Sequence, residues 1–176
     1  KGFSGEDKSK EIKFEIESDI SSFEIEADRE KIDIILYNLL SNAYKYSPKK
    51  SEINVRIGKP VIKKPINYTN QLSFGKLETD EFVEIAVEDS GSGIDSEDLL
   101  HVFNRFEQGK PNLNGKQKVN GSGLGLSICK DYTLLHNGVI KAQSNVGSGS
   151  CFTIQLPRKQ KAQAILFQSH QEFKNL

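Results

Sequence analysis

The chain has 176 residues, of which 36% are hydrophobic and 27% charged, and its 24 Lys and Arg residues balance 24 Asp and Glu. This length supports one α/β domain with a real core, and the ordinary composition excludes a disordered chain. A formal net charge of zero gives no broad electrostatic footprint. We therefore expect neither nucleic acid nor a membrane surface as a direct partner of this segment.

Cysteine usage and targeting signals bear on the compartment. Cys129 and Cys151 are far apart and have apolar neighbours, so we expect two buried, reduced thiols in a reducing, cytoplasmic setting. No apolar run approaches the roughly 20 residues that cross a bilayer, and no signal peptide is present. The chain contains no methionine, so we expect it to be a piece of a longer parent protein. Whether that parent is soluble or membrane-anchored is left open.

The first half of the chain contains short strands and one helix. Residues 1–10 are polar and are expected to form a flexible leader. Two alternating runs, over 12–16 and 23–26, predict a β-hairpin. Asp28 then has the character of a helix N-cap, and apolar residues at helical spacing predict a helix over 32–46. Ser47-Pro48 ends that helix, because a residue before proline is disfavoured in the α region.

Two strands come next, separated by a long polar segment. The strands are predicted over 53–57 and 82–87, where β-branched residues dominate. Residues 58–80 between them contain two prolines and two glycines, and we interpret them as a hairpin insertion that is partly ordered at best. Its role stays open between a docking surface and an inert insertion.

The second half of the chain continues the alternation of helices and strands. A Gly- and Ser-rich turn over 89–93 leads to a short helix around 96–102, and polar residues over 107–123 predict a mobile loop. The remaining elements are a helix over 124–135 that ends at His136-Asn137-Gly138, strands over 139–142 and 150–156, and a C-terminal tail or linker over 158–176. Interleaved helices and strands predict an open mixed sheet with helices on one face.

The predicted helix over 32–46 carries an asparagine pair. Asn38 and Asn42 are four residues apart and share one face, which we expect to be directed toward the core. Their carbonyl oxygens would suit a hard cation such as Mg²⁺ that keeps waters and binds phosphate oxygens. Bonds to neighbouring backbone are an equally weighted alternative. Lys45 and Tyr46 follow, with an ammonium group for phosphate and an aromatic face.

Asp89 ends the strand predicted over 82–87 and opens a glycine-rich turn. A carboxylate at a strand's end can accept a hydrogen bond from an adenine amino group, and Gly91 and Gly93 would let a flat base approach the backbone. An ordinary Asp-Gly turn is the favoured alternative for this pentapeptide taken alone.

A third motif, Gly121-Ser122-Gly123-Leu124-Gly125-Leu126, enters the helix predicted over 124–135. Exposed amides at a helix N-terminus attract phosphate. The run lacks the GK[ST] ending of a Walker loop, and no early βαβ unit opens at it, so neither a P-loop nor a Rossmann fold is indicated.

The order of these motifs carries a family resemblance. Together with Phe103 and Phe106, and with the pattern Ser144-Asn145-Val146-Gly147-Ser148-Gly149-Ser150 before Leu156-Pro157, they resemble the N, G1, F and G2 boxes of the histidine kinase catalytic domain. The match runs from about Asp28 to Pro157. It implies a Bergerat ATP-binding fold over 11–157: a two-layer α/β sandwich whose mixed, largely antiparallel sheet has helices on one face.

The resemblance also implies roles for individual residues around Mg²⁺ and ATP. Asn42 would ligate Mg²⁺ with support from Asn38, Lys45 would contact phosphate, Tyr46 would lie along the purine or sugar, and Asp89 would bind the adenine amino group. Residues 107–120 would form the ATP lid, hinged at Phe103 and Phe106, with Arg105 as a further phosphate or hinge contact. The residues that would wrap the phosphates are Gly121, Gly123, Leu124 and Gly125.

The implied function is transfer of the ATP γ-phosphoryl group to a histidine in two-component signalling, with ADP as product. His101, His136 and His170 have no context resembling an acceptor helix, so we expect the acceptor on a separate dimerisation domain and a response regulator receiver domain as the next partner. ATPase relatives usually carry Glu where Asn38 stands, and an amide cannot take up a proton. A nucleotide-binding regulatory module without phosphotransfer and a gyrase-like ATPase remain alternatives.

Overall fold

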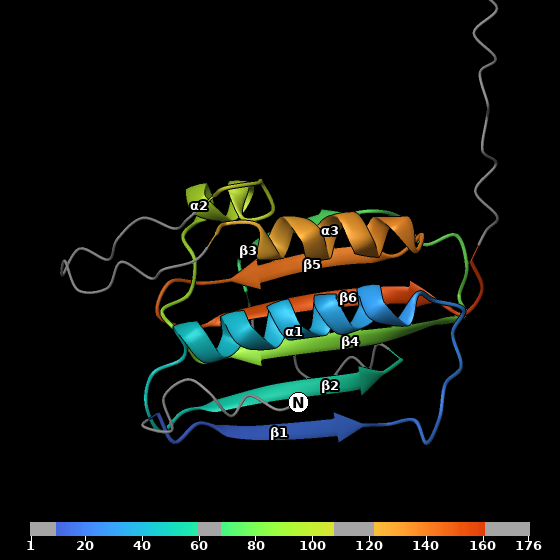
Figure 1. The fold of residues 1–176 in the computed structure, drawn as a ribbon. Coiled ribbons are helices and arrows are strands. Elements are labelled where there is room, and N and C mark those ends of the chain that lie inside the picture. Colours follow the sequence, from blue (N-terminus) through green and yellow to red (C-terminus); the bar gives the residue numbers. More distant parts are fainter. Residues whose placement is uncertain (1–9, 60–67, 108–121, 161–176) are drawn as a thin grey trace, which may run out of the picture.

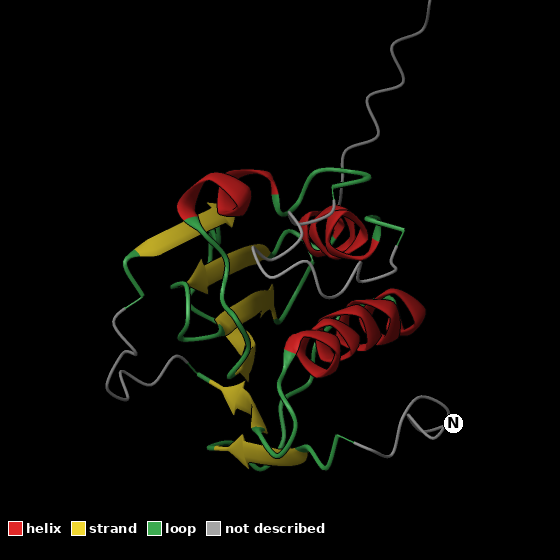
Figure 2. Ribbon diagram, turned by 90° about the vertical axis from the view of Figure 1, so that its left-hand side faces the viewer, coloured by secondary structure: helices red, strands yellow, loops and turns green. Residues whose placement is uncertain are grey.

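The computed structural model describes residues 10–59, 68–107 and 122–160, which form a two-layer α/β sandwich (Figure 1). The sheet has six strands in the order β1-β2-β4-β6-β5-β3. Figure 2 shows the helices on one side of it, as the sequence predicts. The elements are β1 (Lys13–Ser18), α1 (Arg29–Tyr46), β2 (Glu52–Gly58), β3 (Asn70–Phe74), β4 (Phe82–Asp89), α2 (Ser96–His101), α3 (Gly125–Leu135), β5 (Val139–Ser144) and β6 (Ser150–Pro157).

The hairpin predicted over 12–16 and 23–26 is wrong. β1 pairs in parallel with β2, with Phe14 opposite Ile53, and residues 23–26 form no strand. Period-two alternation specifies an extended, one-sided segment but not its partner. Residues 23–26 instead lead to α1, with Phe23 and Ile25 packed against the core and the Glu26 N–H donating to the Arg158 carbonyl at 2.9 Å.

α1 begins and ends where the sequence predicts. The Asp28 side chain accepts from the Lys31 N–H at 3.2 Å, and the helix ends at Ser47 before Pro48. Its buried face consists of Ile35, Leu39 and Ala43. Asn38 and Asn42 lie beside this face and are half-buried, rather than directed into the core as predicted.

The insertion predicted over 58–80 contains a strand, β3, that was not predicted from the sequence. β2 pairs directly with β4, whereas β3 pairs antiparallel with β5 at the opposite edge of the sheet. The chain between β2 and β4 therefore runs to the far edge and back. The strand β3 was missed because it has only 5 residues and lies within a polar segment that contains prolines and glycines. Residues 60–67 lie outside the described residues.

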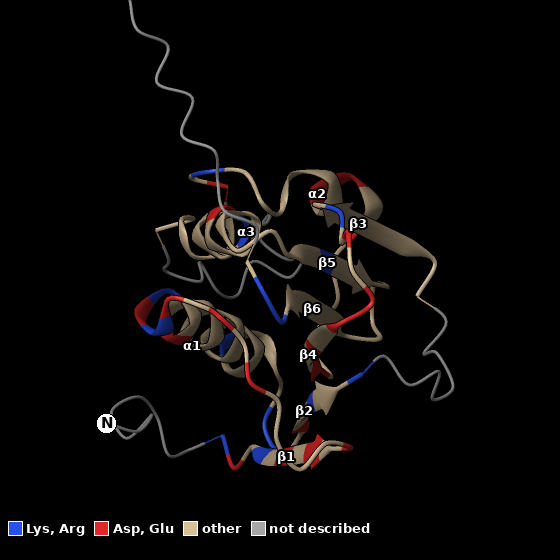
Figure 3. Ribbon diagram, turned by 90° about the vertical axis from the view of Figure 1, so that its right-hand side faces the viewer, with Lys and Arg blue, Asp and Glu red and all other residues tan. Residues whose placement is uncertain are grey.

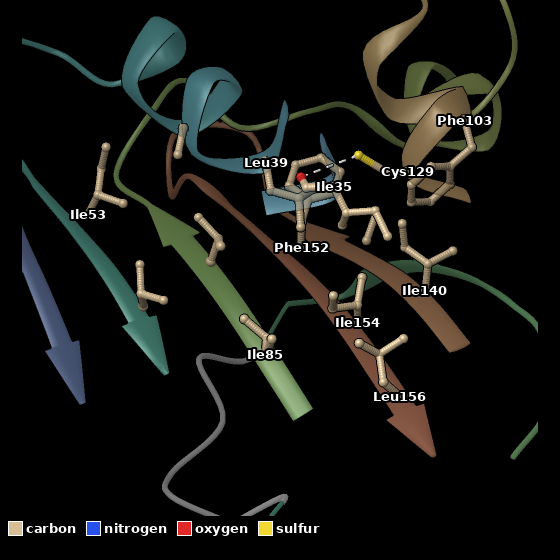
Figure 4. Close-up of a cluster of buried hydrophobic side chains, with 14 of the residues drawn as sticks. Ile35, Leu39, Ile53, Ile85, Phe103, Cys129, Ile140, Phe152, Ile154 and Leu156 are labelled. Carbon is tan, nitrogen blue, oxygen red and sulfur yellow. Dashed lines mark hydrogen bonds between the residues drawn. The ribbon is translucent and has the colours of Figure 1, made fainter. Parts of the chain in front are cut away.

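The core lies between the sheet and the helices α1 and α3 (Figure 4). Ile35 and Leu39 of α1 lie beside Phe152 of β6, and Ile154 and Leu156 continue the core along that strand. Burial of this apolar area is the main stabilising contribution, at about 25 cal/mol per Å².

Both cysteines are buried and free, as predicted. The Cys129 thiol donates to the Ile35 carbonyl at 3.7 Å, which joins α3 to α1 (Figure 4). Burial raises the pKa of Cys129 to about 12 and that of Cys151 to about 11. Both therefore stay as unreactive thiols at neutral pH.

Charges of both signs stand side by side on α1 and β1 (Figure 3). Lys31 pairs with Asp28 at the start of α1, and Lys13 pairs with Glu15 on β1. On the sheet face opposite the helices, Arg56 binds Glu88 at 2.6 Å and Gln155 donates to Glu84 at 2.7 Å. None of the helices in the described ranges has the length and apolar character needed to cross a membrane.

Candidate functional site

Three motifs that are far apart in the sequence meet at one end of the sheet. A Cβ added at Gly91, in the turn after β4, would lie 2.8 Å from the Tyr46 carbonyl oxygen at the end of α1. A Cβ added at Gly125, at the start of α3, would lie 2.8 Å from the side-chain oxygen of Asn38. α1 thus contacts both glycine motifs, at its end through Tyr46 and near its middle through Asn38. The backbone contact at Gly91 leaves no room for a side chain, whereas at Gly125 the Asn38 side chain would have to shift.

The asparagine pair lies at this junction. Asn38 Nδ2 donates to the Ile34 carbonyl at 2.9 Å. The alternative prediction, a bond from the asparagine side chain to neighbouring backbone, therefore holds for the amide nitrogen of Asn38. The same bond fixes the amide plane and leaves Asn38 Oδ1 facing the start of α3. Asn42 follows one turn later, also half-buried.

The donor set at this junction fits Mg²⁺ better than it fits a transition metal. Among the described residues, no group of three or more His, Cys, Asp or Glu could hold a metal ion. The oxygens of Asn38 and Asn42 are neutral and partly accessible. Such ligands suit Mg²⁺, which keeps several waters and takes its remaining ligands from phosphates.

Lys45 and Tyr46 occupy the last turn of α1. Lys45 Nζ lies 5.4 Å from the centroid of the Tyr46 ring, and 47% of Tyr46 is exposed. Partial burial lowers the pKa of Lys45 and raises the pKa of Tyr46. An ammonium group and an accessible aromatic face are therefore present at the helix end where phosphate and purine contacts are predicted.

Asp89 is held at the end of β4, opposite Ile53 of β2 and Ser150 of β6. Only 6% of the residue is exposed, and its Oδ1 accepts from the Gly91 N–H at 2.8 Å. Burial raises the pKa of Asp89 to about 6, although hydrogen bonds from the Gly91 and Ser150 amides oppose this shift. At neutral pH the Asp89 side chain is therefore a buried carboxylate that can accept further hydrogen bonds.

Phe103 and Phe106 have different environments. Phe103 is 1% exposed and packs edge-on against Phe74 and Phe152, with ring centroids 5.8 and 6.2 Å away. Phe106 is 73% exposed and has a φ of 64°, and its N–H donates to the Gly123 carbonyl at 2.9 Å. Arg105 pairs with Asp131 of α3 at 2.9 Å.

The Phe106–Gly123 bond brings the two ends of the predicted lid together. Residues 108–121, which include most of the lid and Gly121, lie outside the described residues. Gly123 has a φ of 68°, and Leu124 occupies the N-cap position of α3 without a side-chain bond to the helix. The first amides of α3, next to Asn38, are therefore placed for an anion.

A family model described as histidine kinase-, DNA gyrase B- and HSP90-like ATPase matches residues 27–160. The chain belongs to this family. Histidine kinase P4 of Formosa agariphila is 35% identical over 147 residues, and WalK, a sensor histidine kinase of Bacillus subtilis, is 34% identical over 137. These alignments cover 82% and 78% of this chain, which spans 9% and 19% of the two relatives.

A solved structure agrees with this assignment to the histidine kinase-like ATPase family. The mycobacterial sensor histidine kinase MprB is 26% identical and superimposes with a TM-score of 0.60. The alignment covers 86% of this chain and 85% of that chain. The fold predicted from the motif order is thus confirmed.

Two serines to which no role was assigned from the sequence support Asp89, one in direct contact with it and one behind the first. Ser150 donates its backbone N–H to Asp89, and the Ser144 hydroxyl lies 3.1 Å from that of Ser150. They are the last residue of β5 and the first residue of β6, on either side of the turn between these strands. The antiparallel pairing of β6 with β4 places this turn next to Asp89, and no pattern in the sequence indicated that pairing.

The described histidines have structural partners. His136 is 4% exposed: its Nε2 accepts from the Asp28 N–H at 3.0 Å and its Nδ1 lies 2.7 Å from the Tyr132 carbonyl. A neutral imidazole protonated on Nδ1 satisfies both bonds. His101 is exposed in α2 beside Asn104, and His170 lies outside the described residues.

Two surface cavities of about 450 and 580 Å³ lie away from the predicted site residues. The smaller is lined by Asp28, Lys31 and His136 among others, and the larger by Gly75, Leu134 and Arg158 among others. Neither is lined by a predicted site residue. We therefore define the candidate site by the convergence of α1, the Asp89 turn and α3 rather than by these cavities.

Proposed function

We propose that this chain is the ATP-binding catalytic domain of a sensor histidine kinase, which transfers the γ-phosphoryl group of ATP to a histidine on a separate dimerisation domain. The observation that carries the proposal is that α1 contacts the Asp89 turn through Tyr46 and the start of α3 through Asn38. The names of the relatives support the kinase reading over other members of the family.

The nucleotide would be held at its two ends by different elements. Asp89 accepts a hydrogen bond from the adenine amino group, and Tyr46 covers the purine or sugar. The amides at the start of α3 and the glycines at 121, 123 and 125 hold the phosphates, with Lys45 supplying positive charge. Asn42 and Asn38 hold Mg²⁺, which supplies charge neutralisation on the phosphate oxygens.

Asn38 favours phosphotransfer over hydrolysis. Its amide cannot take a proton from water, and its Nδ2 is already engaged with the Ile34 carbonyl. The γ-phosphoryl group is therefore kept for a nucleophile brought in line from outside the domain. That nucleophile is the acceptor histidine, and a receiver domain takes the phosphoryl group in turn.

We place the domain in the cytoplasm. The support is indirect: both cysteines are free thiols, which is the usual state in a reducing compartment.

The test is phosphotransfer from radiolabelled ATP and Mg²⁺ to a histidine-bearing dimerisation domain of the parent protein, with this chain as the donor. We expect an acid-labile label on the acceptor, absent when the donor carries Asn42→Ala. Nucleotide binding without label transfer would favour a regulatory module. Steady ATP hydrolysis by the chain alone, lost in Asn42→Ala, would favour a gyrase-like ATPase.

A further inference from the structure

The turn that follows Asp89 is interlocked with the turn that joins β5 to β6. The Gly147 N–H donates to the Ser92 carbonyl at 2.7 Å. A Cβ added at Gly93 would lie 1.9 Å from the Asn145 carbonyl oxygen, and one added at Gly149 would lie 1.9 Å from the Asp89 carbonyl oxygen. Each turn thus sits within van der Waals contact of the other, and the position of one determines the position of the other.

One side chain bonds to both turns. Ser144 is fully buried at the end of β5, and its Oγ accepts from the Ile94 N–H at 2.8 Å. The same hydroxyl donates to the Gly149 carbonyl at 2.7 Å. A serine hydroxyl has one hydrogen to donate, so the Ser150 hydroxyl, 3.1 Å away, donates to Ser144. The three bonds of Ser144 therefore hold Ile94, which follows the Asp89 turn in sequence, and Gly149 and Ser150, which lie beside Asp89 in the sheet.

Ser144 does not contact Asp89 itself. The register places Ser144 opposite Ser150, and Ser150 opposite Asp89, so two strand spacings, about 10 Å, separate the two residues. Any effect of Ser144 on the Asp89 carboxylate must pass through Ile94 on one side and through Gly149 and Ser150 on the other.

We propose that Ser144 is a positioning residue for recognition of the nucleotide base: its hydroxyl fixes the two interlocked turns so that Asp89 faces the adenine amino group. This rests on the proposed function, in which Asp89 contacts adenine. Ser144→Ala leaves the Ile94 N–H and the Gly149 carbonyl without their partner, so the turns keep the Gly147–Ser92 bond but lose the bridge through the Ser144 hydroxyl. The Asp89 carboxylate then samples orientations that do not meet the amino group.

The experiment is a calorimetric titration with non-hydrolysable analogues of ATP and GTP, in Mg²⁺, on the wild type and Ser144→Ala. We expect the dissociation constant for the ATP analogue to rise about tenfold in Ser144→Ala, because the hydrogen bond between Asp89 and the adenine amino group is weakened. The constant for the GTP analogue should stay unchanged, because guanine has no amino group at the position that Asp89 would contact. Preference for adenine therefore falls by the same factor.

Thr133→Val is the matched control. Thr133 is fully buried in α3, and its hydroxyl has no hydrogen-bond partner within the described part of the chain. Its replacement by the isosteric valine should leave both dissociation constants unchanged. Ser144→Thr keeps the hydroxyl and should restore the preference for adenine. Melting temperatures of all variants separate a change in binding from a loss of folding.

Amide exchange at Ile94, followed by NMR, gives a direct check that requires no variant to bind nucleotide. The Ile94 amide should be protected in the wild type and should exchange faster in Ser144→Ala. Rapid exchange in the wild type would overturn the proposal. So would tight binding by wild type and Ser144→Ala alike with the same preference for adenine, although the proposed function would then stand. No binding by the wild type would overturn both.

Discussion

Asp89 shows how a single residue couples the chemistry of the site to stability. Its carboxyl is almost fully buried at the end of β4, and burial raises its pKa to about 6 from 3.8. The folded protein therefore binds this proton more tightly than the unfolded chain does. The stability contributed by protonated Asp89 is complete below pH 3.8 and is lost as the pH rises through about 6.

This linkage predicts a specific difference between the wild type and Asp89→Asn. The asparagine variant keeps the shape but cannot ionise, so the wild type should lose about 2 kcal/mol relative to it between pH 4 and 7. Denaturant unfolding of both proteins at several pH values measures the difference directly, and titrations elsewhere in the protein cancel. A difference that stays constant with pH would show that Asp89 is not buried as an anion.

At the scale of elements, the C-terminal end of α1 is bound to the segment that precedes β1. Lys10 Nζ donates to the carbonyls of Tyr44, Lys45 and Ser47 at 3.0, 2.9 and 3.2 Å. An ammonium group has three donors, so Lys10 caps the carbonyls that α1 leaves unpaired at its end. The same helix end carries Lys45 and Tyr46, so the capping holds part of the candidate site in place.

Lys10→Met should therefore lower the free energy of unfolding by about 1–2 kcal/mol, because the length of the side chain is kept and its donors are lost. Lys49→Met is the control, since Lys49 is an exposed lysine just after the same helix. Denaturant melts at matched ionic strength compare the two variants. Equal, small effects would mean that the bonds of Lys10 do not persist in solution.

The hinge of the predicted lid allows a second test at this scale. Gly123 and Gly147 both have positive φ angles, 68° and 79°. A Cβ at Gly123 would lie 2.6 Å from the carbonyl carbon of Phe106, whereas a Cβ at Gly147 would meet nothing within 4 Å. Gly147→Ala should cost about 1 kcal/mol for its backbone conformation alone.

Gly123→Ala should cost clearly more, because the contact with Phe106 is added to the conformational cost. Thermal unfolding of the two variants measures the difference. If both lose the same stability, the two ends of the lid are not joined as the Phe106–Gly123 bond indicates.

The sequence predicted elements more reliably than their neighbours. α1, β4 and β6 were foreseen because each has a strong pattern and clear ends, such as the Asp28 cap and Ser47-Pro48. β1 was predicted with the wrong partner and β3 was not predicted, because the partner of an edge strand depends on how the rest of the sheet is ordered. Local alternation carries no information about that order.

At the scale of the whole molecule, the sheet order decides what the site contains. The motifs predicted the end of α1, the Asp89 turn and the start of α3 as a site, and their contacts through Gly91 and Gly125 fit that prediction. The order of the sequence could not show that β6 lies beside β4, which places Ser150 next to Asp89 and Ser144 one strand further. Which backbone and hydroxyl groups lie near Asp89 depends on the register of the paired strands, not on residue type.

The central claim is that these distant motifs form one Mg²⁺-dependent ATP site. The most direct measurement is a calorimetric titration of the whole chain with a non-hydrolysable ATP analogue, with and without Mg²⁺, on the wild type, Asp89→Asn and Asn42→Ala. We expect binding by the wild type that needs Mg²⁺ and weakens by at least about tenfold in Asp89→Asn, with the Mg²⁺ dependence lost in Asn42→Ala. Absence of binding by the wild type, or binding that neither substitution changes, would contradict the account.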